Sequence, residues 1–521
     1  MESEEGLRWR KQALKPIKTK TGNKEGEDSV NHHQVEGEPL SPSARLFHEP
    51  HFNVYIIAIM GCKTQIRPDV AKAGLVHTLL KHPRFSSLQV VEDGGEMKWV
   101  RTKVDLEKHV IVTELDPNMD DADQYVEDYV FNLSKSSIEK TQPMWDVHLL
   151  NVKTSDAEGV AIFRIHHSLG DGTSLMSLLL ACTRQISDPQ ALPTVPGVAY
   201  KKKKTKNAMN RSSGWWIWRC LIGFWWGWQL FWNTVVDAFM FMITALFLKD
   251  TETPLKGPPG IEFTPRRIVY RTISLDDIKL VKNAMNTTIN DVALGITQAG
   301  LSRYLNRKYG DSKKDDEASK TKNNLPKKIR LRSTLLINLR PTAGIQALSD
   351  MMEKDTEAKW GNWIGYVLLP FTIGLREDPL DYVRQAKATI DRKKNSLEAI
   401  FTFTVAELVL KIFGIKASAL SHSILTRTTM CFSNLVGPLE EIGYYGHPMA
   451  YLAPTSYGQP HALMINFQSY SNKMTIVLSV DEDTIPDPKQ LRDDIVDSLQ
   501  LIKDAVIQKG LIKEDHNLNK I

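Results

Sequence analysis

One apolar segment restricts the possible folds of this chain more than any other feature. Trp215 to Leu248 contains seven tryptophans, and its only charged residues are Arg219 and Asp237. As a single helix it would be about 51 Å long at 1.5 Å per residue, against roughly 30 Å for the hydrocarbon core of a bilayer. Tryptophan is favoured at membrane interfaces. The segment therefore predicts a helix in contact with a membrane, and the alternative is a buried core helix.

Most polar residues of this segment share one side of the predicted helix, and Thr234 is the exception. At about 100° per residue, five of them fall within a sector of about 80°: Arg219, Gln229, Asn233, Asp237 and Thr244. A narrow polar stripe on an apolar helix is typical of an interfacial helix, or of one whose stripe faces protein. The basic run Lys201 to Lys206 adds attraction to anionic lipid, about 1 kcal/mol for each lysine near the surface.

The apolar segment separates two regions of ordinary globular composition, with 42% hydrophobic and 24% charged residues among 521. Residues 1–38 read as a disordered arm rich in Lys, Glu and Gly. Strand and helix patterns are mixed in 39–200 and again in 261–521, which predicts an α/β protein with two halves. Residues 201–260 hold the basic run, the apolar segment and a Pro/Gly linker, and 310–328 read as a mobile insertion.

Charge and cysteine usage exclude several classes of protein. The net charge of +5 and pI of about 8.7 are mild, and we expect no nucleic-acid partner. Four isolated cysteines form no CxxC pair, which predicts neither a disulfide framework nor a metal site: Cys62, Cys182, Cys220 and Cys431. This pattern and the polar N-terminus favour a reducing compartment without a secretory signal.

The strongest motif is the run His166 to Gly172, which reads His-His-Ser-Leu-Gly-Asp-Gly. It lies between a predicted strand, Gly159 to His166, and a predicted helix from about Thr173 to Arg184. The two glycines suggest a tight turn around Asp171. Because side chains alternate along a strand, His166 and His167 should face opposite sides, so only one of them should reach reacting atoms.

Imidazole suits the deprotonation of an alcohol, because its unperturbed pKa of about 6.5 lies near neutrality. No Gly-x-Ser-x-Gly elbow accompanies the motif, so direct attack by a bound alcohol fits better than an acyl-enzyme. Asp171 is more plausible as a salt-bridged support of the loop than as a participant in chemistry. The competing interpretation is an exposed or zinc-linked histidine pair.

His-His-x-x-x-Asp-Gly resembles the signature of coenzyme-A-dependent acyltransferases, and the chain is similar to the plant-type wax ester synthase/diacylglycerol acyltransferase family. From about Glu38 to the C-terminus, further short runs support the likeness: Pro39 to Phe47, Pro254 to Gly257, Asn290 to Val292, Asn338 to Pro341, Gly361-Asn362 and Ser433 to Pro438. The resemblance implies two chloramphenicol-acetyltransferase-like halves with a tunnel at their interface. It also implies that His167 is the base, that His166 supports it, and that no metal or cofactor is needed. Lys256 and the pair Leu435-Val436 depart from bacterial relatives, which bears on the acceptor site.

Several residues outside the histidine pair are candidates for the site. Asn290 is either a helix N-cap or a polar contact in the tunnel, and Ser433 or Asn434 is either part of a turn or a donor to the oxyanion. Gly172 is a further candidate for substrate or oxyanion binding, and Arg340 is the candidate salt-bridge partner of Asp171.

The resemblance implies transfer of a long acyl chain from acyl-coenzyme A to a fatty alcohol or to diacylglycerol, giving wax ester or triacylglycerol. Alternatives are a related acyltransferase for a soluble alcohol or amine, and a non-catalytic membrane tether. A single span would separate His167 from Asn290 and Ser433, which a shared tunnel forbids, so we expect insertion from one face. We expect the endoplasmic reticulum membrane, with the plasma membrane as the alternative, and both halves in the cytosol.

Overall fold

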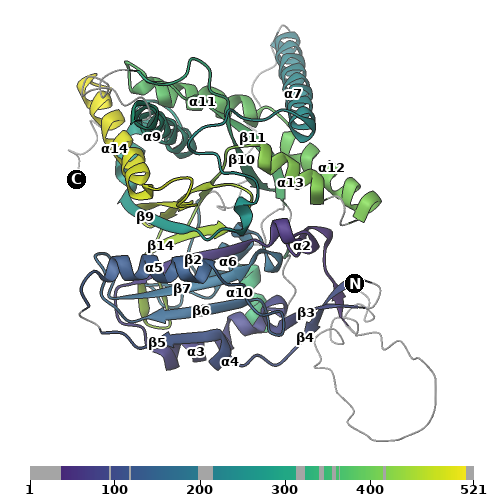
Figure 1. Cartoon of the computed structure of the whole chain (residues 1–521), viewed down its shortest axis with the longest axis vertical. Helices are drawn as coiled ribbons and strands as arrows, with labels where there is room; N and C mark the ends of the chain where they lie inside the picture. The colour runs from purple at the N-terminus through teal and green to yellow at the C-terminus, as the bar shows by residue number, and fades with distance from the viewer. Residues whose placement is uncertain are drawn as a thin grey trace, which may run out of the picture.

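The computed structural model of the chain describes nine stretches: 37–92, 95–116, 119–196, 215–311, 323–339, 345–354, 360–362, 364–414 and 418–511. The predicted arm (1–38, except its last two residues), the basic run Lys201 to Lys206, most of the predicted insertion and Arg340 lie outside the described residues. Two large sheets, one above the other, form the body (Figure 1). This mixed α/β architecture agrees with the prediction.

The first sheet has seven strands in the order β5-β6-β7-β2-β14-β13-β8. Its strands are β2 (Tyr55–Cys62), β5 (Val110–Thr113), β6 (Trp145–Leu150), β7 (Gly159–His166), β8 (Arg184–Gln185), β13 (Ile442–Tyr444) and β14 (His447–Tyr457). Apolar runs in the sequence predict strands at Val54 to Met60, Val110 to Leu115, Trp145 to Val152 and Gly159 to His166, and β2, β5, β6 and β7 confirm them. Strands β2, β6 and β7 are almost wholly buried, whereas Val112 of the edge strand β5 is exposed.

The second sheet has six strands in the order β11-β10-β12-β15-β16-β9. Its strands are β9 (Arg267–Ser274), β10 (Leu331–Asn338), β11 (Ile364–Phe371), β12 (Met430–Leu435), β15 (Leu463–Tyr470) and β16 (Lys473–Val480). The predicted edge strand is β11, and the predicted hairpin joins β15 to β16 through Ser471, whose φ is 51°. A small third sheet contains β1 (Glu38–Pro39), β3 (Ser87–Val91) and β4 (Met97–Arg101).

One strand ties the two halves into a single body. β14 lies inside the second half of the sequence, yet it pairs with β2 from Tyr55 opposite Tyr457 to Cys62 opposite Met449. Helix α10 (Ile345–Lys354) also crosses over, packing on α6 (Gly172–Ala181) of the first half. A division of the chain near residue 260 therefore does not separate the two halves, because residues 345–354 and 442–457 complete the first one.

Helices cover the sheets. The first half carries α3 (Pro68–His77), α4 (Leu106–His109), α5 (Ala122–Ser134) and α6 (Gly172–Ala181). The second carries α8 (Leu275–Ala284), α9 (Ile289–Asp311), α11 (Leu380–Lys394), α12 (Glu398–Phe413), α13 (Ser418–Arg427) and α14 (Pro488–Gln508). Helix α9 is buried on nearly all sides because α8, α11 and α14 pack around it. Apolar spacing in the sequence predicts helices at these places, and α5, α6, α8, α9, α11 and α14 confirm them: Asp121 to Leu133, Thr173 to Arg184, Ser274 to Lys282, Asn290 to Tyr309, Leu380 to Asn395 and Pro488 to Ile507. Helices α12 and α13 were not predicted.

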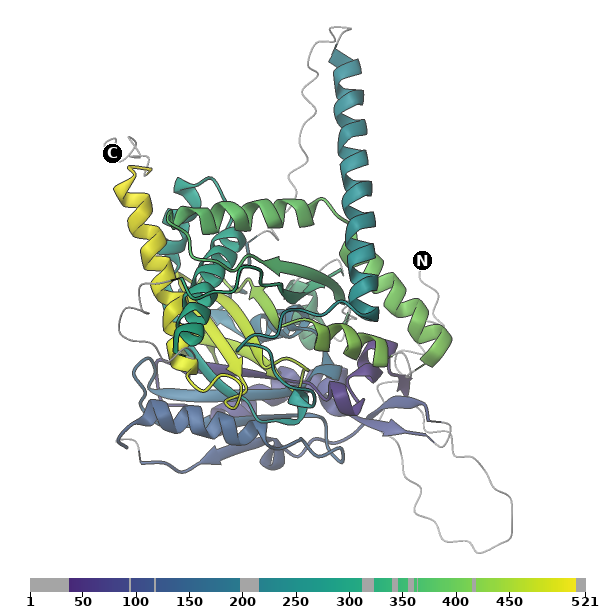
Figure 2. The same cartoon turned by 45° about the horizontal axis from the view of Figure 1, so that its top comes forward.

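The apolar segment is one continuous helix, α7 (Trp215–Leu246), and not a hairpin. It projects from the body beside α12 and α13 (Figure 2). Its residues from Cys220 to Leu246 are apolar and long enough to cross a membrane, and most of their surface is exposed. Large exposed side chains surround the outer turns, including Phe224 at 74% and Trp225 at 64% exposure. The interpretation as a buried core helix is therefore wrong.

Where α7 lies against the body of the protein, its polar stripe faces the body. Asp237 is 1% exposed and lies 2.6 Å from Arg392 and 3.0 Å from Lys393, measured from carboxylate oxygen to nitrogen. Asn233 Nδ2 donates to the carbonyl of Asn395 at 3.0 Å. Thr234, which the sequence analysis set apart from the stripe, accepts a hydrogen bond from the backbone N–H of Leu397 at 3.0 Å. Gln229, further out, is exposed.

A buried ion pair anchors the end of α7 to the second sheet. Arg332 Nε donates to Asp250 at 2.6 Å, and the same guanidinium reaches Thr244 and the carbonyl of Leu248. Thr429 donates to the other oxygen of Asp250 at 2.8 Å. The four cysteines, Cys62, Cys182, Cys220 and Cys431, are unpaired in this structure.

Candidate active site

The histidine motif begins where β7 ends. His166 closes the strand, a 3₁₀ turn covers His167–Leu169, and α6 begins at Gly172. His166 is fully buried, with Nδ1 2.7 Å from Ser168 Oγ and Nε2 3.2 Å from Asn53 Oδ1. Both its nitrogens are thus occupied by protein groups, and burial lowers its pKa well below the ordinary value. His166 does not line the cavity described below.

His167 points the other way, into a cavity, as strand alternation predicted. It is 7% exposed, and its ring stacks on Phe47 with 4.3 Å between the ring centroids. Nδ1 is buried without a hydrogen bond to another described residue, which leaves Nε2 for the cavity. Burial lowers the pKa of His167, while its own backbone carbonyl and the carboxylate of Asp171 oppose this shift. The imidazole is therefore neutral at pH 7 and able to accept a proton.

Asp171 is the N-cap of α6. Its Oδ1 accepts hydrogen bonds from the backbone N–H of Ser174 at 2.8 Å and from Thr173 Oγ1 at 2.9 Å. The carboxylate is 3% exposed, and its position at a helix N-terminus suits a negative charge. This agrees with a supporting role in the loop, although the sequence analysis named a salt bridge and not a cap. The proposed partner, Arg340, lies outside the described residues.

Gly170 is required by packing and not by a turn. Its φ of 172° is extended and open to any residue. A Cβ atom there would lie 2.8 Å from the indole of Trp360, whose Nε1 donates to the carbonyl of Leu169. Gly172 lines the cavity, and a Cβ atom there would meet only Leu435, at 3.7 Å.

The cavity beside His167, called here the first cavity, has a volume of about 250 Å³. Its deep part lies between the first sheet and helices α3 and α6, and its walls are almost entirely apolar: Ile56, Met60, Leu75, Leu149, Phe163, Ile165, Leu175 and Leu179 among them. Its other end, at the junction of the two sheets, is polar. A linear apolar chain fits this form, with its reactive end at His167.

Two polar residues face His167 across the junction. Ser433 on β12 and Asn466 on β15 are neighbours in register on parallel strands, and both line the first cavity. Asn466 Nδ2 donates to Thr455 Oγ1 at 2.6 Å. The sequence analysis selected Ser433 but missed Asn466, because it lies inside an apolar strand without any turn or motif to mark it.

Asn290 and Asn434 are brought together, but neither lines the cavity. Asn434 Nδ2 donates to Asn290 Oδ1, and Asn290 is exposed. The N-cap interpretation of Asn290 is wrong as well. Thr288 Oγ1 accepts from the N–H of Asp291, and Asp291 accepts from the N–H of Thr288, which is a reciprocal capping box two residues earlier.

Two motifs distant in sequence meet behind His167. Phe47, from the run that forms α2 (Pro42–Leu46), supplies the stacked ring. Asn362 Nδ2 donates to the carbonyl of His167 at 3.0 Å, and Ser43 Oγ donates to the carbonyl of Asn362 at 2.9 Å. These contacts give physical roles to the runs Pro39 to Phe47 and Gly361-Asn362, for which the sequence analysis assigned no role.

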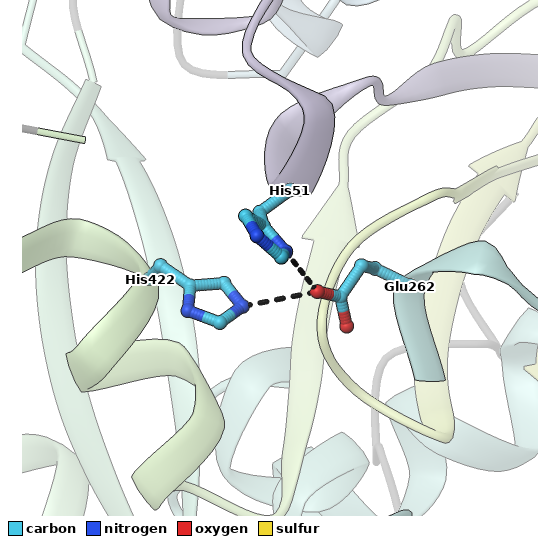
Figure 3. A group of neighbouring side chains, drawn as sticks. All are labelled: His51, Glu262 and His422. Carbon is cyan, nitrogen blue, oxygen red and sulfur yellow. Dashed lines mark hydrogen bonds and ion pairs between the residues drawn. The ribbon is translucent and has the colours of Figure 1, made fainter. Parts of the chain in front are cut away.

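Among the described residues, one group has the spacing of metal ligands, and it lies away from His167. Glu262 Oε1 accepts from His51 Nδ1 at 2.5 Å and from His422 Nε2 at 3.1 Å (Figure 3). His51 belongs to the 3₁₀ turn Pro50–Phe52, Glu262 to the turn Ile261–Phe263 and His422 to α13. Both imidazoles share one carboxylate oxygen, so the group joins the first half to the second.

Comparison with known proteins agrees with this geometry. The model of the wax ester synthase/diacylglycerol acyltransferase catalytic domain matches residues 72–293, and the model of the C-terminal domain of that family matches 360–503. The chain belongs to the wax ester synthase/diacylglycerol acyltransferase family. It is therefore an acyltransferase, and the motif at His166 to Gly172 lies within the matched catalytic domain.

Two relatives show how far the likeness extends. The chain is 53% identical over 488 residues to wax ester synthase/diacylglycerol acyltransferase 11 of Arabidopsis thaliana, covering 93% of this chain and 99% of that one. It is 50% identical over 502 residues to wax ester synthase/diacylglycerol acyltransferase 6 of the same plant, covering 93% and 96%.

Solved structures show the same fold at low identity. A wax ester synthase/diacylglycerol acyltransferase from Marinobacter aquaeolei superposes with a TM-score of 0.57 at 18% identity, covering 90% of this chain and 99% of that one. A trichothecene 15-O-acetyltransferase from Fusarium sporotrichioides superposes with a TM-score of 0.51 at 14% identity, covering 89% and 95%. The predicted two-halved acyltransferase fold is thereby confirmed.

Proposed function

We propose that this acyltransferase moves a long acyl chain from acyl-coenzyme A to a fatty alcohol or to diacylglycerol, with His167 as the general base. The observation that carries the proposal is the position of His167. A neutral imidazole, free at Nε2, stands where a long apolar cavity meets polar residues from the other half. The names of the relatives from Arabidopsis, wax ester synthase/diacylglycerol acyltransferase, supply the two classes of acceptor.

The reaction needs one base and no acyl-enzyme. His167 Nε2 accepts the hydroxyl proton while the alcohol oxygen forms a bond to the thioester carbon, and the carbonyl electron pair moves onto its oxygen. When that pair returns, the C–S bond breaks, and the sulfur takes the proton from His167. Ser433 Oγ and Asn466 are the side chains across the cavity that can donate to the transient oxyanion, and one such donor is typically worth about 2.7–4 kcal/mol.

The apolar depth of the first cavity favours the acyl chain as its occupant. Apart from its polar end, the cavity is lined mainly by apolar side chains, with Thr78, Tyr444 and His447 as polar exceptions. Coenzyme A is a polyanion and would remain at the aqueous side. This division places the thioester, which joins the two parts of the donor, at the polar end of the cavity.

We propose in addition that α7 enters a membrane from one face. Residue 196 and residue 249 both belong to the one body described above. If α7 crossed the bilayer completely, residues 197–214 would have to cross back, and these include the five lysines of the run Lys201 to Lys206. Each lysine at the bilayer centre costs roughly 2.5–3.5 kcal/mol on insertion scales. Insertion into one leaflet avoids this cost and keeps both halves in the cytosol, with the endoplasmic reticulum as the expected membrane and the plasma membrane as the alternative.

The function is tested with membranes that contain the protein and labelled acyl-coenzyme A, offering hexadecanol and diacylglycerol in competition. Labelled wax ester or triacylglycerol supports the proposal, and their ratio gives the preferred acceptor. Ester formed only with a water-soluble alcohol would instead favour the related function named above. No ester with any acceptor would refute the proposed activity.

The topology is tested in sealed vesicles with single cysteines placed at Lys204 and at Lys256. Labelling of both sites from the outer side supports insertion from one face. Labelling from opposite sides would restore a single span, and it would contradict a tunnel that both halves build.

A further inference from the structure

A second pocket, about 150 Å³ in volume, lies on the far side of Phe47 from the first cavity. Helices α2, α12 and α13 form its walls, and Phe241 at the anchored end of α7 completes them. Ile364 lines both this pocket and the first cavity, so the two are neighbours. We propose that this pocket is the entrance through which the lipid alcohol passes from the membrane to His167. The inference rests on the proposed function and specifies the route of its acceptor.

The pocket opens on a surface that carries exposed apolar side chains. Exposed residues form its rim, among them Ser41, Pro42 and Glu407. The outer side of α12 next to this rim carries exposed apolar side chains: Leu397, Ile400, Leu408, Ile412 and Phe413, of which Ile412 is 63% exposed. Helix α7 contacts both α12 and α13 and stands beside them (Figure 2). Both α7 and α12 carry large exposed apolar side chains, and apolar surface of this kind marks a contact with lipid or protein.

The inner end of the pocket holds a buried side-chain amide. Asn362 lines it and is 3% exposed. Its Nδ2 is used by the carbonyl of His167, while its Oδ1 is buried and has no hydrogen-bond partner among the described residues. A buried acceptor without a donor is costly, which points to a ligand that brings one. An alcohol hydroxyl is such a donor, whereas a thioester has none to give.

Phe47 separates the two spaces. Its ring lines the second pocket on one side and stacks on His167 on the other. Rotation about its Cα–Cβ bond is the smallest movement that would join them. An alcohol held by Asn362 would then reach Nε2 from the membrane side, while the acyl chain occupies the first cavity. The two substrates would not compete for one opening, and a polyanionic donor would not have to approach lipid.

The test uses two substitutions on α12 in the full-length protein. Ala406 lines the pocket, so Ala406→Phe should fill it, and the exposed Thr404, which does not line it, gives the matched control Thr404→Phe. With hexadecanol in phosphatidylcholine vesicles, we expect Ala406→Phe to raise the KM for the alcohol at least tenfold and to leave the KM for palmitoyl-coenzyme A unchanged. Thr404→Phe should change neither. An unchanged KM for hexadecanol in Ala406→Phe, or a change confined to palmitoyl-coenzyme A, would overturn the proposal.

A second measurement needs no substitution and so does not depend on the folding of a variant. A sixteen-carbon alcohol that carries a diazirine at its far end is photolysed with the wild-type protein in vesicles, and the attached peptides are identified by mass spectrometry. Attachment to α12 or α13 supports the entrance. Attachment confined to α3 and α6, around the first cavity, would overturn it. If the wild-type protein makes no ester, the proposed function fails, while the attachment pattern still reports where the alcohol binds.

Discussion

The loop around His167 is polar and the outer turns of α7 are apolar. In both regions, however, some side chains are left without a binding partner among the described residues. In the loop, His166 and Asp171 are hydrogen-bonded to protein groups, whereas His167 keeps Nε2 for the cavity. On α7, Asp237 is paired with Arg392 and Lys393, whereas Trp225 and its neighbours are exposed over more than half of their surface. An unpaired polar group and an exposed apolar surface both cost stability in an isolated molecule. Each region therefore indicates a site where another molecule binds.

The largest effect is expected at the free imidazole. His167→Ala should lower kcat by about 10²–10⁴-fold, the usual contribution of a general base, and should lower Tm moderately because the ring stacks on Phe47. His166→Ala should lower Tm more and kcat less, because its fully buried ring is hydrogen-bonded to Asn53 and Ser168. Ester formation and thermal unfolding of both variants decide between the roles. Near-normal turnover in His167→Ala would refute the base assignment.

The exposed apolar side of α7 should give the next largest effect. Trp225→Glu combined with Trp226→Glu should weaken binding to vesicles at least tenfold, since burial of one large apolar side chain contributes about 1.5–3 kcal/mol. The Tm in detergent should not change, because both side chains are exposed. Vesicle flotation measures the binding. Flotation equal to that of the wild-type protein would mean that α7 does not hold the protein on lipid.

The anchored part of the same helix should respond in the opposite way. Asp237→Ala removes the partner that Arg392 and Lys393 share, and loss of such buried bonds typically costs about 1–3 kcal/mol. We expect a lower Tm and unchanged vesicle binding, measured as for the tryptophan pair. A loss of binding without a loss of Tm would show that Asp237 faces headgroups and not protein in the membrane.

Two substitutions of Asp171 distinguish its role as an N-cap from the effect of its charge. Asp171→Ala should cost about 1 kcal/mol, because the N–H of Ser174 loses its acceptor. Asp171→Asn keeps an N-cap of equal quality, so it should lower the Tm less than Asp171→Ala does. Chemical denaturation of the two variants measures the difference. Equal destabilisation by Asn and Ala would show that the charge matters, as the predicted salt bridge with Arg340 requires.

The pH profile should give the smallest effect. Burial lowers the pKa of His167, so the neutral form persists below the ordinary value of 6.5. We expect the acid limb of kcat/KM to have its midpoint below pH 6.5, with activity lost only as pH falls further. Asp171→Asn should move the limb lower still, because the carboxylate raises the pKa of His167. A midpoint above pH 6.5 would contradict the assigned burial of the imidazole.

Local patterns predicted much of this protein because the forces behind them are local. Alternation along β7 separated His166 from His167, since it depends only on strand geometry. The apolar character of Trp215 to Leu248 predicted a helix, and its polar stripe predicted a side that faces either the membrane interface or protein. In the structure, Asn233 and Asp237 face protein. The division near residue 260 does not hold, because β14 pairs with a strand nearly four hundred residues earlier and no local pattern encodes that distance.

The sequence by itself determined the reaction class and the apolar segment, because a short motif and a composition bias carry these. Only the tertiary structure decided what surrounds His167. Phe47 and Asn362 reach it from remote segments, Asn466 was hidden in an apolar strand, and Asn290 was turned away from the cavity. These outcomes follow from packing between segments far apart in the chain. Packing of this kind depends on the shapes of both partners at once, and so it is not written in either segment alone.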